Sequence, residues 1–181
     1  MDIKIIKEAG YEEAIGGMAF SFQTEAIKIA DVKPRSYKAA KTLAHQDGGH
    51  NKFLEHIILW VDIRASLTWW KQADTYRVGM SKLSKSTMHT VMKRPLTTWD
   101  FGDVIDLNTI DILNTYIMNR DFKRVLDYLP GAYMQTRRCC LNYKTVRNMI
   151  NQRQGHKLPE WKDFIEGILE NVEHKQLLVK E

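Results

Sequence analysis

An arginine at the end of an apolar stripe is the first residue whose type and position suggest chemistry. Val146, Met149 and Arg153 recur at spacings of three and four residues, so they share one face of a helix. The apolar members turn this face toward the core and bring Arg153 to its margin, where a guanidinium group needs an anionic partner. A bound phosphate would meet that need. A salt bridge to Glu160 or Asp163 would meet it too, and the residues by themselves favour the salt bridge.

Two histidines and a glutamate follow a glycine pair in residues 48–56, Gly-Gly-His-Asn-Lys-Phe-Leu-Glu-His. The glycines free the backbone to approach a ligand closely. His50, Glu55 and His56 also offer metal-ligating atoms, but their spacing matches no known zinc-enzyme pattern, so no metal is expected. The simpler interpretation is a turn that leads into a buried strand, and such a turn can still contact a ligand.

A polar stretch at residues 78–87 concentrates hydroxyl groups and cations. Ser84 and Ser86 lie in it, with Arg77, Lys82 and Lys85 in or beside it. Groups of this kind surround phosphate oxygens in loops that bind nucleotides without a P-loop, although most such loops are only solvated. The chain contains no Gly-x-x-x-x-Gly-Lys-Ser/Thr, Gly-x-Gly-x-x-Gly or Gly-x-Ser-x-Gly motif. Nothing therefore indicates a P-loop NTPase, a Rossmann cofactor site or a catalytic serine, and no catalytic nucleophile is expected.

The charge balance allows an anionic ligand without identifying it. Lys and Arg number 27 against 22 Asp and Glu, and this net charge of +5 is spread along the 181 residues. Direct binding of nucleic acid is not favoured, because Trp69, Trp70 and Trp99 are more typical of a core than of a base-stacking surface. A small phosphorylated ligand fits the charge better.

The cysteines and the hydropathy pattern bear on the compartment. Cys139 and Cys140 are the only cysteines, and adjacent residues are poorly placed for a structural disulfide, which favours a reducing cytoplasm. The N-terminal residues show no export-signal pattern. The most apolar stretch, residues 57–63, is too short to span a bilayer and contains Asp62, so membrane insertion is not expected.

Periodicity and turn signals predict the elements that position these residues. Branched or alternating apolar residues predict strands at residues 1–10 and 56–65, the second at the centre of a sheet. Helical spacing predicts helices at residues 11–30, 35–44, 66–76, 109–127, 133–153 and 161–172. In the fifth of these, Arg147 is expected on the solvated outer face. No repeat or linker divides the chain, so the pattern indicates one α+β domain over residues 1–181.

Taken in chain order, these segments resemble the flavin-dependent thymidylate synthases, and in particular a divergent small branch of that family associated with bacteriophages. Residues 50–56 are similar to the family's His-x-x-Pro-Phe-Glu-His segment, with Phe53 and His56 retained, Glu55 one place from His56, and lysine in place of proline. In the family this segment helps to hold the flavin. The resemblance therefore implies flavin-binding roles for His50 and Glu55.

The next segment departs further from the family pattern, which is Arg-His-Arg followed, after seven residues, by Ser-x-Arg-Tyr. Aligned on Ser84, residues 74–76 are Asp-Thr-Tyr and residues 84–87 are Ser-Lys-Ser-Thr, so only the serine is retained. Arg77 lies one position after the triplet. In the family the triplet contacts the flavin and the later motif contacts the phosphate of deoxyuridylate (dUMP). The resemblance implies a flavin role for Arg77 and a substrate role for Ser84 and Ser86.

The third segment is the most specific match. Residues 129–142 contain Leu-Pro, Tyr, Gln-Thr and Leu-Asn, which look like the family's Leu-Pro, Tyr-Thr and Asn-x-Arg pattern, with Lys144 at the arginine. Arg153 follows nine residues later, where the family has its phosphate-binding arginine, and residues 156–160 resemble His-Ala-Gln-x-Glu after a one-residue deletion. The resemblance implies that Arg153 binds the nucleotide phosphate. The residues that it implies for the flavin are Asn142, Asn148 and His156.

The resemblance covers residues 48–161 and carries expectations for the whole protein. It implies a central, mostly antiparallel sheet flanked by helices, and a homotetramer whose active sites lie between subunits. It also implies transfer of a one-carbon unit from a folate donor to C5 of dUMP or a related pyrimidine deoxynucleotide, with FAD carrying the redox chemistry. The lost Arg-His-Arg triplet supports an alternative, a protein that keeps the fold and binds a nucleotide or a partner without catalysis. If phage-encoded, the protein is expected in the host cytoplasm.

Overall fold

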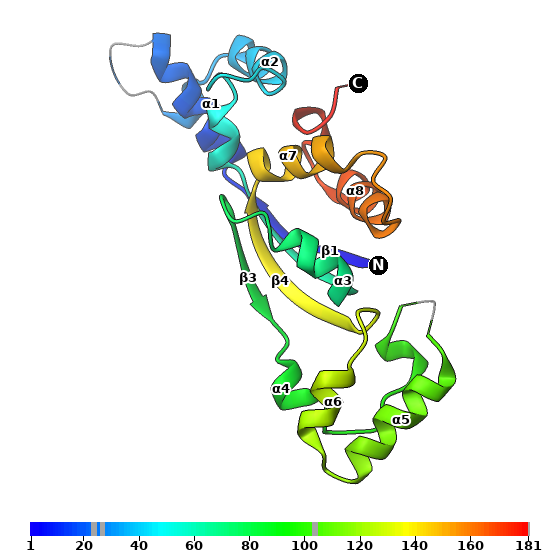
Figure 1. Ribbon diagram of the computed structural model, residues 1–181. Coiled ribbons are helices and arrows are strands. Elements are labelled where there is room, and N and C mark those ends of the chain that lie inside the picture. The colour runs from blue at the N-terminus through cyan, green and yellow to red at the C-terminus, as the bar shows by residue number, and fades with distance from the viewer. Residues whose placement is uncertain (23–24, 26–27, 103–104, 181) are drawn as a thin grey trace.

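A four-stranded antiparallel sheet forms the centre of the molecule (Figure 1). The computed structural model describes residues 1–22, 25, 28–102 and 105–180. The strands lie in the order β1-β2-β4-β3, and they are β1 (Asp2–Ala9), β2 (Ile58–Ser66), β3 (Met80–Ser84) and β4 (Met134–Asn142). The predicted α+β class is confirmed, and so is the interior place of the strand predicted at residues 56–65.

One face of the sheet packs against helices and the other is open. Along β2, Leu59, Val61, Ile63 and Ala65 are fully buried, and the residues between them are half-buried. This alternation is typical of an antiparallel strand with one solvated face. The strand is thus less buried than its apolar composition predicts.

Helices α3 (Leu67–Ala73), α7 (Tyr143–Arg153) and α8 (Glu160–Asn171) share the core with the covered face. Trp69 and Trp70 of α3 are fully buried there, as the core interpretation of these tryptophans expects. Trp99 is 63% exposed, so the same expectation is wrong for it. Its ring instead lies under the guanidinium carbon of Arg64, 4.0 Å from the ring centroid.

Helices α1 (Tyr11–Ala19) and α2 (Pro34–Leu43) lie together at one end of the sheet (Figure 1). The helix predicted at residues 11–30 ends at Ala19, and the prediction is wrong for the described residues after it, where Phe20 and Phe22 are exposed instead of extending a buried face. Residues 23, 24, 26 and 27 of that prediction lie outside the described residues. The predicted helix at residues 35–44 is confirmed as α2.

Residues 133–153 form a strand and a helix, and the single helix predicted there is wrong. In β4 the buried Cys139 and Leu141 alternate with more exposed neighbours, which is the period of a strand. Asn142 ends the strand and caps α7, because its side chain accepts a 2.8 Å hydrogen bond from the backbone N–H of Thr145. The apolar face predicted for the second half of the segment is present, with Val146, Met149 and Ile150 buried.

The polar stretch at residues 78–87, predicted as a loop, contains the edge strand β3. Its residues pair with β4, from Met80 opposite Leu141 to Ser84 opposite Arg137. An edge strand exposes much of its length to solvent, which is why its composition resembles that of a loop.

The segment between β3 and β4 holds a second hydrophobic cluster at the far end of the molecule (Figure 1). Its helices are α4 (Thr87–Thr90), α5 (Leu107–Met118) and α6 (Phe122–Tyr128). The single helix predicted at residues 109–127 is wrong, because the chain breaks at Arg120, whose φ of 55° is left-handed and cannot continue a helix. The helix predicted at residues 161–172 is confirmed as α8.

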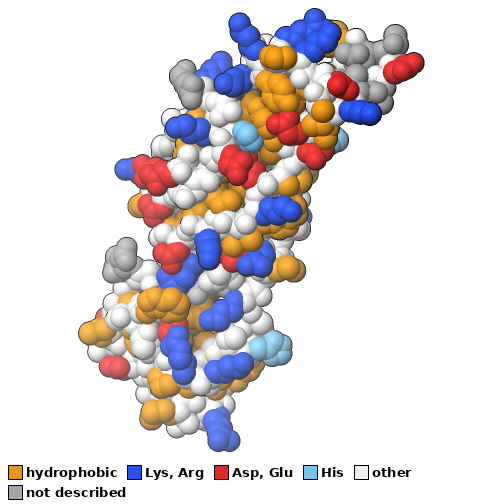
Figure 2. Space-filling model, turned by 180° about the vertical axis from the view of Figure 1, so that it is seen from behind, with side chains coloured by type: hydrophobic (Ala, Val, Ile, Leu, Met, Phe, Trp, Pro, Cys, Tyr) orange, Lys and Arg blue, Asp and Glu red, His pale blue; other side chains and the backbone are white. Residues whose placement is uncertain are grey.

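The outline of the molecule is elongated (Figures 1 and 2). On the face shown in Figure 2, acidic side chains lie among the basic ones. Within the described ranges, no helix has both the length and the apolar character needed to cross a bilayer. The 3₁₀ helices are Phe20–Phe22, Ile29–Asp31, Lys52–His56, Thr98–Asp100 and Lys175–Leu177.

Candidate functional site

A cavity of about 560 Å³ opens beside the first two turns of α7. Three segments that are far apart in the sequence form its walls: the turn before β2, the loop between α3 and β3, and α7 itself. Cavities of this size commonly bind small molecules. Its lining residues are Asp47, Asn51, Glu55, Thr75, Tyr76, Arg77, Val78, Gly79, Asn142, Lys144, Thr145, Arg147 and Asn148.

The α3–β3 loop is held against the start of α7 by two hydrogen bonds around Gly79. Oγ1 of Thr145 donates to the carbonyl of Val78 at 2.8 Å, and the backbone N–H of Asn142 donates to the carbonyl of Gly79 at 2.9 Å. The side-chain amide of Asn142 also packs on Gly79, whose φ is +69°. A Cβ at this position would lie 2.4 Å from Nδ2 of Asn142, so only glycine fits without displacing the loop.

Basic side chains outnumber acidic ones in the cavity lining. Nζ of Lys144 lies 2.6 Å from Oε1 of Glu55, so these two charges are paired. Arg77 is exposed and forms no hydrogen bond or ion pair with the described residues. The third cation, Arg147, lies 3.7 Å from Asp47. The cavity therefore suits an anionic ligand.

The prediction that Arg147 faces solvent is wrong. Its side chain is only 14% exposed and lines the cavity, whereas Asp47 is 91% exposed. Nε of Arg147 is buried and has no hydrogen-bond partner in the part of the chain that the structure describes. Helical spacing does not predict this burial, because Arg147 lies outside the apolar stripe of α7. The turn before β2 and the α3–β3 loop enclose it instead.

Arg153 lies outside the cavity lining but contacts one of its walls. Its Nε donates a 2.9 Å hydrogen bond to the hydroxyl of Tyr76, and its guanidinium carbon lies 4.7 Å from the ring centroid of Trp161. Neither predicted salt bridge forms. Glu160 instead accepts hydrogen bonds from the backbone N–H and the hydroxyl of Ser66, and Asp163 pairs with the N-terminal amino group. Among the described residues, no carboxylate lies within ion-pair distance of Arg153.

The residues predicted for the flavin fall into two groups. Glu55, Arg77, Asn142 and Asn148 come together in the cavity. His50 is exposed in the turn before the 3₁₀ helix Lys52–His56 and is not among the lining residues.

The other flavin candidate, His156, follows α7, where its Nδ1 accepts a 3.1 Å hydrogen bond from the backbone N–H of Leu158. It too lies outside the lining.

The serines predicted for the substrate do not line the cavity. Ser84 is exposed at the end of β3. Ser86 caps α4, where its hydroxyl accepts a hydrogen bond from the backbone N–H of His89 at 3.3 Å. The sequence motifs imply no ligand role for several other lining residues, among them Asn51, Tyr76, Thr145 and Arg147.

The aspartate at the first position of the lost triplet is held by two cations of its own. Asp74 lies 2.8 Å from Nζ of Lys82 and 2.8 Å from the guanidinium of Arg137. Burial raises the pKa of Asp74, but the hydrogen bonds from Lys82 and Arg137 outweigh it and leave this pKa below its usual value. Lys82, a cation of the polar stretch, is thereby paired with Asp74, and it is not among the lining residues.

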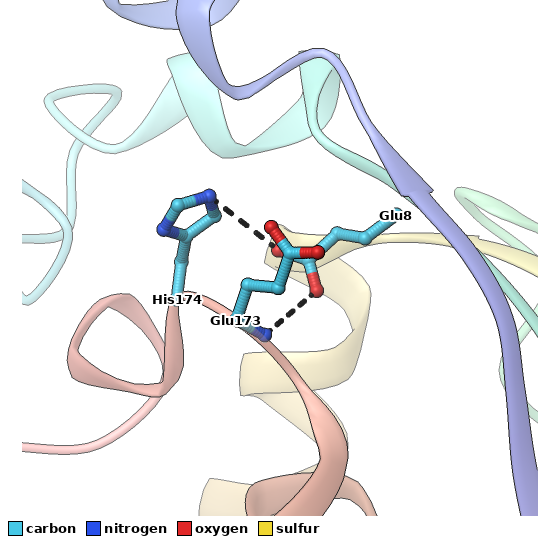
Figure 3. Close-up of side chains that lie close together, drawn as sticks. All are labelled: Glu8, Glu173 and His174. Atoms are coloured by element: carbon cyan, nitrogen blue, oxygen red, sulfur yellow. Dashed lines mark hydrogen bonds and ion pairs between the residues drawn. The ribbon is translucent and has the colours of Figure 1, made fainter.

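A separate group of potential metal ligands connects the two ends of the chain (Figure 3). In the described residues, donor atoms of Glu8, Glu173 and His174 lie within 4.8 Å of one another. Both oxygens of Glu8 are occupied, because Oε1 accepts from the hydroxyl of Tyr143 at 2.6 Å and Oε2 from the backbone N–H of Glu173 at 3.0 Å. The ring of His174 stacks on Tyr11. The geometry is that of a partly buried polar junction between β1, α7 and the C-terminal segment.

The fold is that of the flavin-dependent thymidylate synthases. A flavin-dependent thymidylate synthase, ThyX, from Helicobacter pylori, complexed with FAD and dUMP, matches with a TM-score of 0.83 over 98% of both chains at 16% identity. A second structure of ThyX from the same organism, also with FAD and dUMP, matches with a TM-score of 0.83 over 99% of this chain and 98% of that one at 15% identity. No family model matches the sequence, and no curated protein matches it.

Proposed function

We propose that this protein is an enzyme that transfers a one-carbon unit from a folate donor to C5 of dUMP, or of a related pyrimidine deoxynucleotide, with FAD as cofactor. The observation that supports it most is the meeting of Glu55, Arg77, Asn142 and Asn148 in one cavity. These residues come from three segments, and the resemblance of those segments to the family implied a flavin role for each of them. The fold is shared with proteins whose solved structures contain FAD and dUMP.

The cavity has the donors and acceptors that a flavin nucleotide requires. Asn142 and Asn148 offer amide groups, and Arg77 and Arg147 offer cations that have no hydrogen-bonded carboxylate among the described residues. Bound FAD would supply the reducing hydride for the one-carbon unit. The chain's own residues would bind and orient the reactants and exclude water from them.

Arg153 is the proposed ligand of the nucleotide phosphate. It lacks a carboxylate partner among the described residues, and Tyr76 and Trp161 fix its position, so its outer N–H groups are available to an anion. Since Tyr76 also lines the cavity, the phosphate site would adjoin the flavin site. Ser84 and Ser86 remain proposed substrate contacts, and His50 and His156 remain proposed flavin contacts.

Reconstitution with FAD tests the proposal. The purified protein, incubated with FAD and desalted, should retain the visible absorbance of bound flavin, and an Asn148→Ala variant should retain less. Asn171→Ala is the matched control, because this amide only bonds to the carbonyl of Gly167 on α8. With reduced FAD and methylenetetrahydrofolate, dUMP should be converted to dTMP. A protein that retains no flavin at any FAD concentration would contradict the proposal.

One observation favours a second candidate, a nucleotide-binding protein without catalysis. The triplet positions do not offer cations to the cavity, because Asp74 is paired with Lys82 and Arg137, and the hydroxyl of Tyr76 is bonded to Arg153 and Gln152. This candidate predicts that dUMP raises the melting temperature without turnover. Formation of dTMP excludes it.

The finer features follow from the same proposal. We propose that the chain is a single domain and that it assembles into a homotetramer with active sites between subunits. Two exposed apolar residues support contacts between subunits: Val78 beside the cavity and Leu83 on β3. Light scattering after size exclusion would measure the mass. The free thiols of Cys139 and Cys140 support a cytoplasmic location, which for a phage protein is the host cytoplasm.

A further inference from the structure

We infer that Arg147 binds the diphosphate group of the ligand in the α7 cavity, where it does the work of the cations missing from the triplet at residues 74–76. This rests on the proposed function only in taking the cavity as a cofactor site. The family pattern gives no role to this position, and the sequence alone placed it in solvent.

The burial of Arg147 is unusual for a cation with so weak a partner. The side chain is 14% exposed, its Nε is buried, and this Nε has no acceptor among the described residues. Buried polar groups nearly always have hydrogen-bond partners, and a charged one requires them most. The same side chain lines the cavity, so a ligand oxygen there can bind its guanidinium group once the side chain turns toward it.

The only carboxylate near Arg147 in the described part of the chain cannot serve as a full partner. Asp47 lies 3.7 Å away, beyond hydrogen-bond length, and is 91% exposed on a turn. An ion pair at this distance, with one partner in solvent, is weak. An incoming phosphate can therefore replace Asp47 at the guanidinium without breaking a hydrogen bond.

The neighbouring charges favour a group with two negative charges. Lys144 is already paired with Glu55 at 2.6 Å, which leaves Arg77 and Arg147 as the cations of the lining without a close partner. Two guanidinium groups match the two charged phosphates of a diphosphate, and guanidinium binds phosphate in a bidentate manner. ADP and inorganic diphosphate carry this group without a flavin.

Calorimetric titration of the full-length protein with inorganic diphosphate and with ADP tests the inference. Arg147→Gln should weaken binding of both by about 10- to 100-fold, the usual effect of losing hydrogen bonds to a charged group. Asp47→Asn should strengthen binding, because it removes the competing carboxylate. Arg124→Gln is the charge-matched control, since Arg124 is 63% exposed on α6 and should leave both affinities unchanged.

Two further measurements make each outcome decisive. Arg147→Lys keeps the charge and loses the two-pronged guanidinium, so this variant should fold and show an intermediate loss of diphosphate affinity. If circular dichroism shows that Arg147→Gln is unfolded, Arg147→Lys takes its place in the titrations. Wild-type protein that binds neither diphosphate nor ADP, or an Arg147 variant that binds both as wild type does, overturns the inference. FAD binding that is unaffected by Arg147→Gln overturns the inference about Arg147 and leaves the proposed function intact. Binding of ADP without binding of FAD contradicts the proposed function and leaves the inference about Arg147 intact.

Discussion

The hydroxyl of Tyr76 accepts a 2.9 Å hydrogen bond from Nε of Arg153 and donates one of 2.9 Å to Oε1 of Gln152. Tyr76 also lines the cavity beside α7. One aromatic side chain therefore joins the cavity wall to the arginine proposed for the nucleotide phosphate. A substitution at Tyr76 should therefore change nucleotide binding at Arg153.

Replacing Tyr76 with phenylalanine should weaken dUMP binding by about 3- to 10-fold, because Arg153 loses the acceptor that orients it. Isothermal titration measures the change. The double variant Tyr76→Phe, Arg153→Gln should bind no more weakly than Arg153→Gln alone, since the tyrosine acts through the arginine. Additive losses would show that Tyr76 has a role independent of Arg153.

Gly79→Ala should both destabilise the protein and weaken ligand binding in the cavity. A Cβ there meets Nδ2 of Asn142 at 2.4 Å and Oγ1 of Thr145 at 2.5 Å, so the loop must move away from α7. Gly48→Ala is the matched control, because its φ of +74° is similar and no atom lies within 4 Å of the added Cβ. The control should lose only the strain energy, about 1 kcal/mol in urea unfolding, and keep its ligand affinity. Equal effects of the two substitutions would contradict the packing argument.

Glu8→Ala should lower the free energy of unfolding by about 1–3 kcal/mol, because it leaves the hydroxyl of Tyr143 and the backbone N–H of Glu173 without their acceptor. The side chain of Glu8 is 5% exposed. Burial and the hydrogen bond to Glu8 raise the pKa of Tyr143, so this hydroxyl stays protonated and remains a donor. Glu166→Ala, at an exposed pair with Lys162, should change stability by less than about 0.5 kcal/mol. Chemical denaturation compares the two, and an unchanged midpoint for Glu8→Ala would refute the role of the junction.

Acid should weaken the contact between Arg94 and Asp100, whose closest atoms lie 2.6 Å apart. Burial raises the pKa of Asp100, but hydrogen bonds from Arg94 and Thr97 outweigh it and hold this pKa below its ordinary value. Because the pKa is lower in the folded state, the stabilisation is present above the unfolded value of about 3.9 and is lost as the pH falls through the folded pKa. Urea midpoints between neutral and acidic pH should therefore fall less steeply for Asp100→Asn than for wild type. Parallel pH profiles would contradict this.

Only one of the two thiols should react in the native protein. Cys139 is fully buried, and burial raises its pKa to about 12, so it is neither accessible nor ionised near neutral pH. Cys140 is half-buried on the open face of the sheet. Titration with a thiol reagent should count no more than one thiol per chain when folded and two in denaturant. Rapid reaction of both in the native state would show that β4 opens readily.

The sequence predicts the fold where one period dominates. Residues 56–65 are dense in branched apolar residues and form an interior strand, and residues 161–172 have a clear helical stripe. It fails where a buried strand runs directly into a helix, as at Asn142, because the two periods merge into one amphipathic pattern. It also fails at β3, where an edge strand has the composition of a loop.

For the candidate site, the motifs single out residues that lie together in space, and no motif marks the residues that packing adds to them. Glu55, Asn142 and Asn148 meet in the cavity as the ordered motifs imply. Arg147 becomes buried only because the turn at Asp47 and the α3–β3 loop close over it. Such enclosure depends on contacts between distant segments, which no local pattern contains.

The helices α4, α5 and α6 pack around their own hydrophobic cluster and join the sheet through the chain between β3 and β4. None of their residues lines the α7 cavity. The exposed residues of α5 and α6 can therefore change in surface chemistry without altering the lining of this cavity. A reporter group attached to the surface of α5 or α6 should therefore leave ligand binding in the cavity unchanged.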